Sequence, residues 1–211
     1  MSAVLCCLDF KYLIVKQAFE SIITSFLKNR VGLINNFLNE DLSSNLKENL
    51  LLLLFDKQLK VAGIGNSSNF LTNKSIRSDI IYWLDRKHNN IHEDSFFDVI
   101  DEFVKYLNMT CYTGITGYEF HYAYYEKGSS YKRHLDQFRD NQNRAYSMIM
   151  YLNNNWSPSD GGQLCIYHQD VSQIISPING KCVFFKSSEL EHEVLLNHKP
   201  RMSITGWLKT N

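Results

Sequence analysis

The chain has 211 residues, of which 44% are hydrophobic and 21% are charged, so its composition is that of a globular protein rather than a disordered one. Basic and acidic side chains balance at 22 each, which leaves no positive surplus of the kind that nucleic-acid binding requires. The longest apolar run, residues 50–55, is far shorter than the roughly 20 residues needed to cross a bilayer. We therefore expect neither nucleic acid nor a membrane as a partner.

The cysteines indicate a reducing environment. There are five of them, an odd number, and no two form a Cys-x-x-Cys pair, which argues against a disulfide framework or a thiolate zinc site. Residues 1–10 have no basic stretch before their apolar residues and no small-residue cleavage site, so no secretory leader is expected. The sequence predicts a cytoplasmic protein.

The first half of the chain reads mainly as helices. Apolar side chains recur at three- and four-residue intervals up to a break near Arg30, which predicts an amphipathic helix that buries Tyr12, Val15, Phe19, Ile22 and Phe26. A short strand is expected over 31–38. A second helix is expected over 41–59, and its leucine run at 50–54 predicts burial nearly all round, against a sheet.

A loop rich in Gly, Asn and Ser follows at 63–75, then a strand over 80–84. A third helix, begun by Asp94 or Ser95, carries apolar residues from Phe96 to Leu107. After residue 112 apolar residues recur at every second position, which is the period of a strand. Short strands are expected at 118–124, 133–138, 145–153, 163–168, 181–186, 191–196 and 202–209. Many short strands after helices predict one β-sandwich, barrel or jelly roll supported by N-terminal helices.

The most informative motif lies among these strands. His134 and Asp136 are two residues apart, so on a strand they point to one face, and His192 follows later. Two imidazoles and one carboxylate form the ligand set that holds Fe(II) in oxygenases with positions left open. Arg201 adds a planar, always charged group suited to a carboxylate such as the distal end of 2-oxoglutarate. This combination indicates an oxygenase.

Further segments carry a family resemblance: Tyr131–Asp136, Tyr151–Asn153 with Trp156, Gly161–Tyr167, Phe184–Phe185, His192–Val194 and Arg201–Trp207. Through them residues 118–209 resemble the iron(II)- and 2-oxoglutarate-dependent dioxygenases of the prolyl 4-hydroxylase type. They are most similar to the bacterial, SM-20-like relatives of the oxygen-sensing prolyl hydroxylases. Weaker similarity reaches back through residues 76–79 and 34–38.

The resemblance implies a mainly β fold with a double-stranded β-helix (jelly-roll) core. It implies one domain over 1–211, in which about three α-helices and short strands within 1–111 buttress a catalytic core at 112–210. It also implies that O₂ is consumed with 2-oxoglutarate, that succinate and CO₂ are released, and that ascorbate is a candidate reductant.

The same resemblance implies residue roles. His134, Asp136 and His192 would bind Fe(II), and Arg201 would pair with the far carboxylate of 2-oxoglutarate. Tyr151 would hydrogen-bond that carboxylate, and Tyr124 would line the cosubstrate pocket. Alternate residues of a strand point to the same face, so Arg201 shares its face with Ser203, Thr205 and Trp207. This is consistent with the role of Arg201 and makes Thr205 and Trp207 further candidates for cosubstrate binding.

The substrate is less well indicated. The resemblance implies a prolyl residue of a protein or peptide, gripped by a rim at Tyr131, Lys132, Arg133 and residues 138–144. A free amino acid or other small molecule is the enzymatic alternative, and a jelly-roll module that binds metal without turnover is a non-enzymatic one. A zinc hydrolase is disfavoured because no His-Glu-x-x-His helix is present. His121 and His168, which fall on expected strands, are interpreted as structural or surface groups.

Overall fold

The computed structural model describes residues 2–63, 76–137, 142–169 and 171–211, and of residues 2–14 it describes the backbone alone. Its helices are α1 (Ser2–Asn29), α2 (Glu40–Phe55) and α3 (Ile91–Cys111), with short 3₁₀ turns at Arg86–His88 and Pro158–Asp160. Its strands are β1 (Val31–Ile34), β2 (Lys60–Val61), β3 (Ile80–Trp83), β4 (Gly117–Tyr125), β5 (Tyr131–His134), β6 (Arg144–Tyr151), β7 (Leu164–Tyr167), β8 (Ser172–Ile175), β9 (Cys182–Lys186), β10 (His192–Val194) and β11 (Arg201–Lys209).

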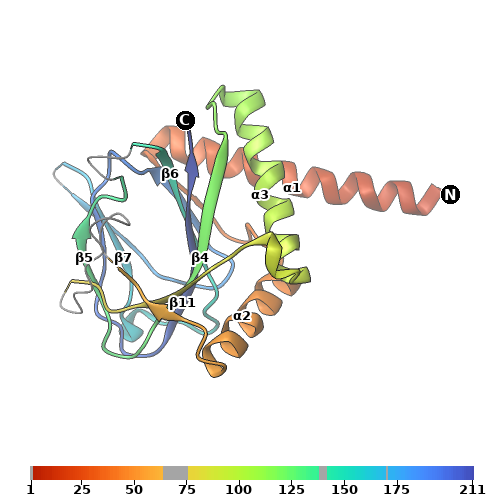
Figure 1. The fold of residues 1–211 in the computed structure, drawn as a ribbon. Coiled ribbons are helices and arrows are strands. Elements are labelled where there is room, and N and C mark those ends of the chain that lie inside the picture. Colours follow the sequence, from red (N-terminus) through yellow and green to blue (C-terminus); the bar gives the residue numbers. More distant parts are fainter. Residues whose placement is uncertain (1, 64–75, 138–141, 170) are drawn as a thin grey trace.

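The strands form two antiparallel sheets. The major sheet has seven strands in the order β1-β9-β6-β11-β4-β3-β2, and the minor sheet has four in the order β5-β10-β7-β8. The helices cover one face of the major sheet, and the minor sheet lies on the opposite side (Figure 1). This is the jelly-roll architecture expected from the sequence, with three helices against its larger sheet.

Alternation along the major-sheet strands divides the core in two. Phe120, Tyr122, Ile204 and Leu208 belong to a cluster with the helices, whereas Tyr125 and Tyr151 belong to a cluster between the sheets. The helix-facing cluster draws on α1, α2 and α3 together, including Phe19, Ile22, Leu46, Phe96 and Ile100. Each strand therefore serves two different interfaces with alternate side chains.

Helix α3 begins earlier than the sequence predicted. Asn90 is its N-cap, and the Asn90 side-chain oxygen accepts hydrogen bonds from the backbone N–H groups of His92 and Glu93. An asparagine in this position satisfies helix N–H groups that have no partner within the helix. The capping residue is thus Asn90 rather than Asp94 or Ser95.

The prediction for the leucine run was wrong. Leu50 is buried, but Leu52 is 63% exposed and Phe55 is 83% exposed. Helix α2 lies on the outside of the molecule, so only one side of the run reaches the core, through the buried Leu50 and the partly buried Leu53. Among the described residues no helix combines the length and apolar content that crossing a membrane requires.

Other boundaries also differ. The first strand ends at Ile34 rather than residue 38, and Ser172–Ile175, which no sequence signal indicated, is a strand of the minor sheet. The loop expected at 63–75 lies almost wholly outside the described residues. Cys111, Cys165 and Cys182 are free thiols.

Candidate active site

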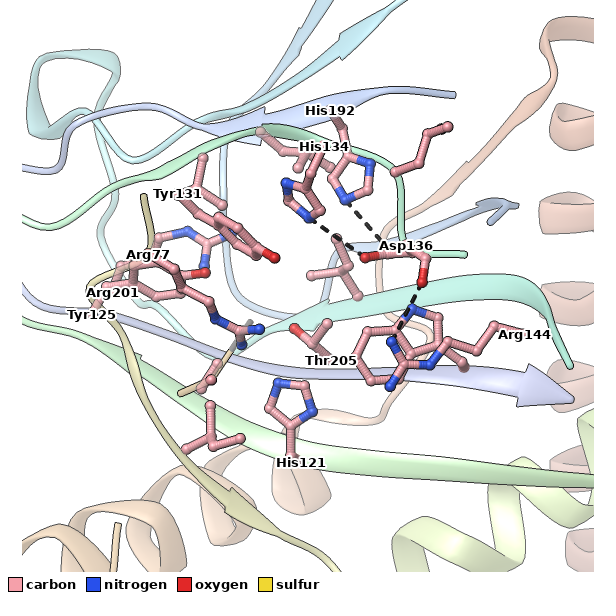
Figure 2. Close-up of a pocket in the computed structure, with 18 of the residues that line it drawn as sticks. Arg77, His121, Tyr125, Tyr131, His134, Asp136, Arg144, His192, Arg201 and Thr205 are labelled. Atoms are coloured by element: carbon pink, nitrogen blue, oxygen red, sulfur yellow. Dashed lines mark hydrogen bonds and ion pairs between the residues drawn. The ribbon is translucent and has the colours of Figure 1, made fainter. Parts of the chain in front are cut away.

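His134, Asp136 and His192 lie together at one side of the space between the sheets. One ligand atom from each lies within 4.8 Å of the others, and no other described residues form such a group of metal-binding side chains. The Asp136 carboxylate lies beside the two neighbouring rings, with both imidazole Nε2 atoms 3.5 Å from a carboxylate oxygen (Figure 2). This geometry suits one divalent ion.

The sequence predicted that His134 and Asp136 lie on one strand, but the structure brings the three residues together in another way. His134 ends β5 and pairs with His192 on β10, so the two imidazoles are neighbours across the minor sheet. Asp136 lies beyond the end of β5 rather than on the strand. Its carboxylate is held by the Ser147 hydroxyl of β6, which donates a hydrogen bond of 2.7 Å to Oδ2.

Contacts behind the triad fix its orientation. His134 Nδ1 lies 2.7 Å from the Lys132 carbonyl oxygen, and His192 Nδ1 lies 3.1 Å from that of Leu190. An Nδ1–H that donates to a carbonyl leaves the Nε2 lone pair for a metal. The Tyr131 ring stacks on His134, with the two ring centroids 3.7 Å apart, which limits rotation of that imidazole.

Electrostatics favour the metal-binding protonation states. Burial disfavours a charged Asp136, but the neighbouring His192 and His134 and the Ser147 hydrogen bond outweigh it and hold the pKa of Asp136 below its ordinary value. Burial also lowers the pKa of His192, although Asp136 opposes part of that effect. A neutral imidazole and an ionised carboxylate are the forms that bind divalent ions.

Arg201 begins β11 and is only 1% exposed. Its Nε donates to the Gly162 carbonyl oxygen at 2.9 Å, and the guanidinium carbon lies 4.9 Å from the Tyr125 ring centroid and 5.1 Å from that of Tyr151. No carboxylate among the described residues forms an ion pair with it. A buried cation without an anionic partner is costly, so the position fits the carboxylate of a ligand.

Gly162 makes this close approach possible. Its φ is +65°, and a Cβ atom there would lie 3.1 Å from Cδ of Arg201. Glycine is the residue that adopts this backbone conformation without a steric penalty. The Gly161–Gly162 turn therefore serves as a backbone cradle for the arginine.

The other expected cosubstrate residues divide into two groups. Thr205 and Trp207 line a cavity of about 470 Å³ that also holds the triad and Arg201. Tyr151 belongs to the cluster between the sheets, and its ring contacts the Arg201 guanidinium. Its buried hydroxyl has no hydrogen-bond partner among the described residues. Burial raises the pKa of this hydroxyl to about 12, so it remains a donor at neutral pH.

The expectation for Tyr124 was wrong, because the cavity is lined by Tyr125 instead. Tyr124 is packed against the helix-facing cluster, and Tyr125 belongs to the cluster between the sheets. The register explains the difference: Tyr125 pairs with Arg201 across β4 and β11, so these two side chains share a face. Counting back from His134 selected the neighbouring tyrosine, which points the other way.

The rim is also only partly as expected. Tyr131 and Arg144 line the cavity, but Arg133 turns to the outside of the minor sheet, where it pairs with Glu191 and lies over the Tyr167 ring. Lys132 is exposed and does not line the cavity, and residues 138–141 are outside the described part of the chain. Sequence reasoning missed Arg77, Trp83 and His121 as cavity residues.

Comparison with known proteins agrees with this geometry. The sequence profile of the 2OG-Fe(II) oxygenase superfamily matches residues 120–209. A Pseudomonas putida prolyl 4-hydroxylase structure is similar over 92% of this chain and 99% of that one, with 30% identity and a TM-score of 0.82. The chain belongs to the 2OG-Fe(II) oxygenase superfamily. The resemblance to prolyl 4-hydroxylases drawn from the sequence is confirmed, and this chain is a 2-oxoglutarate-dependent oxygenase.

Two further relatives are prolyl hydroxylases. A Trichoplax adhaerens structure, a prolyl hydroxylase in complex with a hypoxia inducible factor peptide, matches 95% of this chain and 92% of that one at 26% identity, with a TM-score of 0.84. The prolyl 3-hydroxylase OGFOD1 of Xenopus laevis is 34% identical over an alignment of 77 residues that covers 31% of this chain and 15% of the frog protein. The match thus spans only a small part of that relative.

The cofactors expected from the sequence, Fe(II) with 2-oxoglutarate and O₂, are those of this superfamily. The residues present fit both groups. The triad supplies the nitrogen and oxygen donors that Fe(II) takes, and the buried Arg201 and the unpartnered Tyr151 hydroxyl fit a carboxylate.

Proposed function

We propose that this oxygenase hydroxylates a prolyl residue of a protein. The observation that carries the proposal is the similarity to the Pseudomonas putida prolyl 4-hydroxylase over nearly the whole of both chains. The Trichoplax adhaerens relative is a prolyl hydroxylase with a peptide bound, and this chain is similar to it over a comparable length. The cavity supports the proposal because it has room for more than a cosubstrate.

In this proposal His134, Asp136 and His192 hold Fe(II), and Arg201 holds the far carboxylate of 2-oxoglutarate with help from Tyr151. The bound metal, with 2-oxoglutarate and O₂, supplies the oxidising chemistry that hydroxylates a C–H bond and releases succinate and CO₂. The chain's own contribution is orientation. The Nδ1 hydrogen bonds set both imidazoles, and Ser147 sets the Asp136 carboxylate.

The cavity mouth suits a peptide. Trp83 is 46% exposed and lines the cavity, as do Tyr131 and Arg144, so aromatic and cationic groups meet the solvent there. Proline has a fixed φ, which lowers the ordering cost of an extended peptide that presents it. The Arg144 guanidinium lies 3.4 Å from the Trp207 ring centroid and pairs with Glu119, so this part of the wall is held in place.

A mass-spectrometric experiment tests the proposal. The protein is incubated with iron, 2-oxoglutarate and a panel of proline-containing cellular proteins, and His134→Ala serves as the inactive control. We expect a gain of one oxygen on proline in some proteins with the wild type alone. Succinate release stimulated only by free amino acids or other metabolites would favour the small-molecule alternative, and metal binding without any succinate release would favour a non-catalytic module.

We also propose that residues 1–211 form one domain, in which 1–111 supports the catalytic core at 112–210. The helix-facing cluster supports this, because it joins Phe19, Leu46 and Phe103 to Phe120 and Ile204. A fragment of residues 112–211 should not fold alone, and circular dichroism with thermal unfolding checks this. Use of ascorbate and a cytoplasmic location stay predictions.

A further inference from the structure

One wall of the cavity carries polar atoms that the iron and cosubstrate roles do not use. His121 on β4 is 1% exposed and lines the cavity, yet neither ring nitrogen has a hydrogen-bond partner among the described residues. The indole Nε1–H of Trp207, which lines the same cavity, is likewise without a partner there. Buried polar groups are normally satisfied, so three unpartnered atoms in one wall indicate a ligand.

These atoms are adjacent to one another and away from the arginine. The ring centroids of His121 and Trp207 are 5.6 Å apart, those of His121 and Trp83 are 5.0 Å apart, and the two indole rings are 6.4 Å from each other, so the three rings form one cluster. His121 pairs with Thr205 on β11, four residues from Arg201, a separation of about 13 Å along the strand. Figure 2 shows the His121 ring directed into the cavity from the side opposite the triad. A cosubstrate held at Arg201 leaves this wall to the substrate.

The charges around the wall favour a neutral acceptor. Burial is the main reason that the pKa of His121 lies well below its ordinary value. The positive charges of Arg77 and Arg144 lower this pKa further, and the negative charge of Asp136 opposes them only in part. Arg77 is paired with Asp79 at 2.6 Å, and Arg144 with Glu119 at 2.8 Å. A neutral imidazole offers one N–H, and the indole offers another. Two neutral donors beside cations that already have partners suit a carbonyl oxygen better than a carboxylate.

We propose that His121 and Trp207 bind a carbonyl oxygen of the substrate, the one that follows the prolyl ring, and thereby select peptide-bonded proline. The proposal rests on the prolyl hydroxylase function above and names the side chains that recognise its substrate by hydrogen bonding. Trp83 and Trp207 both contact the His121 ring and limit its rotation. His121 is then a specificity-determining residue that contacts the substrate, rather than the structural histidine that the sequence suggested.

Three small probes separate the carbonyl from the rest of the substrate. All three share the acetyl carbonyl before the ring, and they differ after the ring, where acetylprolinamide carries a neutral carbonyl, acetylproline a carboxylate and acetylpyrrolidine no substituent. We expect kcat/KM, measured by succinate release, to be at least about ten-fold higher for acetylprolinamide than for acetylpyrrolidine, because only the amide has the carbonyl oxygen that accepts the buried hydrogen bonds from His121 and Trp207. His121→Phe keeps a ring beside the two indoles and should remove most of that preference, whereas His121→Gln, which retains a donor, should keep a larger part of it.

A second readout does not depend on turnover. In protein loaded with Zn(II) and 2-oxoglutarate, the ¹⁵N resonances of the His121 ring should shift on addition of acetylprolinamide and not of acetylpyrrolidine. Binding of 2-oxoglutarate should be unchanged in both His121 variants, which checks that they fold. If His121→Phe does not fold, Trp207→Phe takes its place, since it loses the indole donor and should also weaken the preference.

The outcomes are distinguishable. An undiminished preference in His121→Phe, an equal loss for all three probes, or a preference for acetylproline over the amide would overturn the inference. If acetylprolinamide shifts the His121 ring but is not hydroxylated, the prolyl hydroxylase function fails while the hydrogen bond stands.

Discussion

The two faces of the major sheet are built from the same strands and differ in how completely their polar atoms are satisfied. On the helix-facing side the Tyr122 hydroxyl accepts a hydrogen bond from Asn49, which also donates to Glu93. On the cavity side lie all the buried side-chain atoms found without a partner in the described chain, on His121, Tyr151 and Trp207. Arg201 is buried on that side without a carboxylate partner.

This difference indicates that stability and function are divided between alternate residues of each strand. An unsatisfied buried polar group costs free energy in the unliganded protein, and a ligand that pairs with it recovers that cost. Substitutions on the helix-facing side should therefore change only the free energy of unfolding, and substitutions on the cavity side should change binding, with or without a change in stability.

The largest effect is expected at the metal site. His134→Ala removes one of three ligands and should abolish iron binding and succinate formation, because two remaining ligands cannot complete the set. His168→Ala, directly after β7 and outside the triad, is the matched control and should bind iron normally. Stoichiometric Fe(II) or Mn(II) binding by His134→Ala, measured by calorimetry, would show that the ligand assignment is wrong.

Adjacent phenylalanines on β9 compare the two faces directly. Phe184 packs against Phe26, Phe103 and Tyr146 on the helix side, and the Phe185 ring lies 4.9 Å from that of His192. Each substitution by alanine should lower the free energy of unfolding by about 3–5 kcal/mol, the usual cost of such a cavity. Only Phe185→Ala should also weaken iron binding by the folded protein. Denaturant unfolding and metal titration together check this, and equal metal affinities would remove the distinction between the faces.

Arg201→Ala should raise the 2-oxoglutarate concentration needed for half-maximal succinate formation by about 100-fold, since a hydrogen bond to a charged group is worth up to about 3 kcal/mol, roughly twice a neutral one. Iron binding should survive. Arg133→Ala removes an exposed arginine paired with Glu191 and should change neither property. Loss of iron in Arg201→Ala would mean that the arginine supports the triad rather than the cosubstrate.

Local patterns in the sequence were enough to predict the three helices and most strands, and they selected His134, Asp136, His192 and Arg201, which the structure brings to one cavity. Parity along the last strand also placed Arg201, Thr205 and Trp207 on one face, as observed. The prediction that Tyr124 lines the cavity was wrong because a count along the chain does not reveal how β4 pairs with β11. Pairing between distant strands also determines that His121 faces the cavity, and no pattern near residue 121 contains that information.

Amphipathic patterns were less informative where an element is only partly covered. The run at residues 50–54 gave no indication of which side of α2 would meet the sheet, because every position in it is apolar. The strand at 172–175 is short and lies at the edge of the minor sheet, where its alternation is weak. In both places the packing of distant segments, rather than local sequence, decided the outcome.

The smallest effect compares two buried tyrosine hydroxyls, one on each face. Tyr122→Phe removes a hydroxyl that is bonded to Asn49, so the free energy of unfolding should fall by about 1 kcal/mol. Tyr151→Phe removes a hydroxyl without a partner in the described structure, so the free energy of unfolding should stay within about 0.5 kcal/mol or rise. The 2-oxoglutarate requirement should then increase a few-fold in Tyr151→Phe and not in Tyr122→Phe. Denaturant unfolding and succinate assays on both variants measure the contrast. A loss of stability in Tyr151→Phe equal to that in Tyr122→Phe would show that the cavity-side hydroxyl is already satisfied in the unliganded protein, and the division between the two faces would not hold at this position.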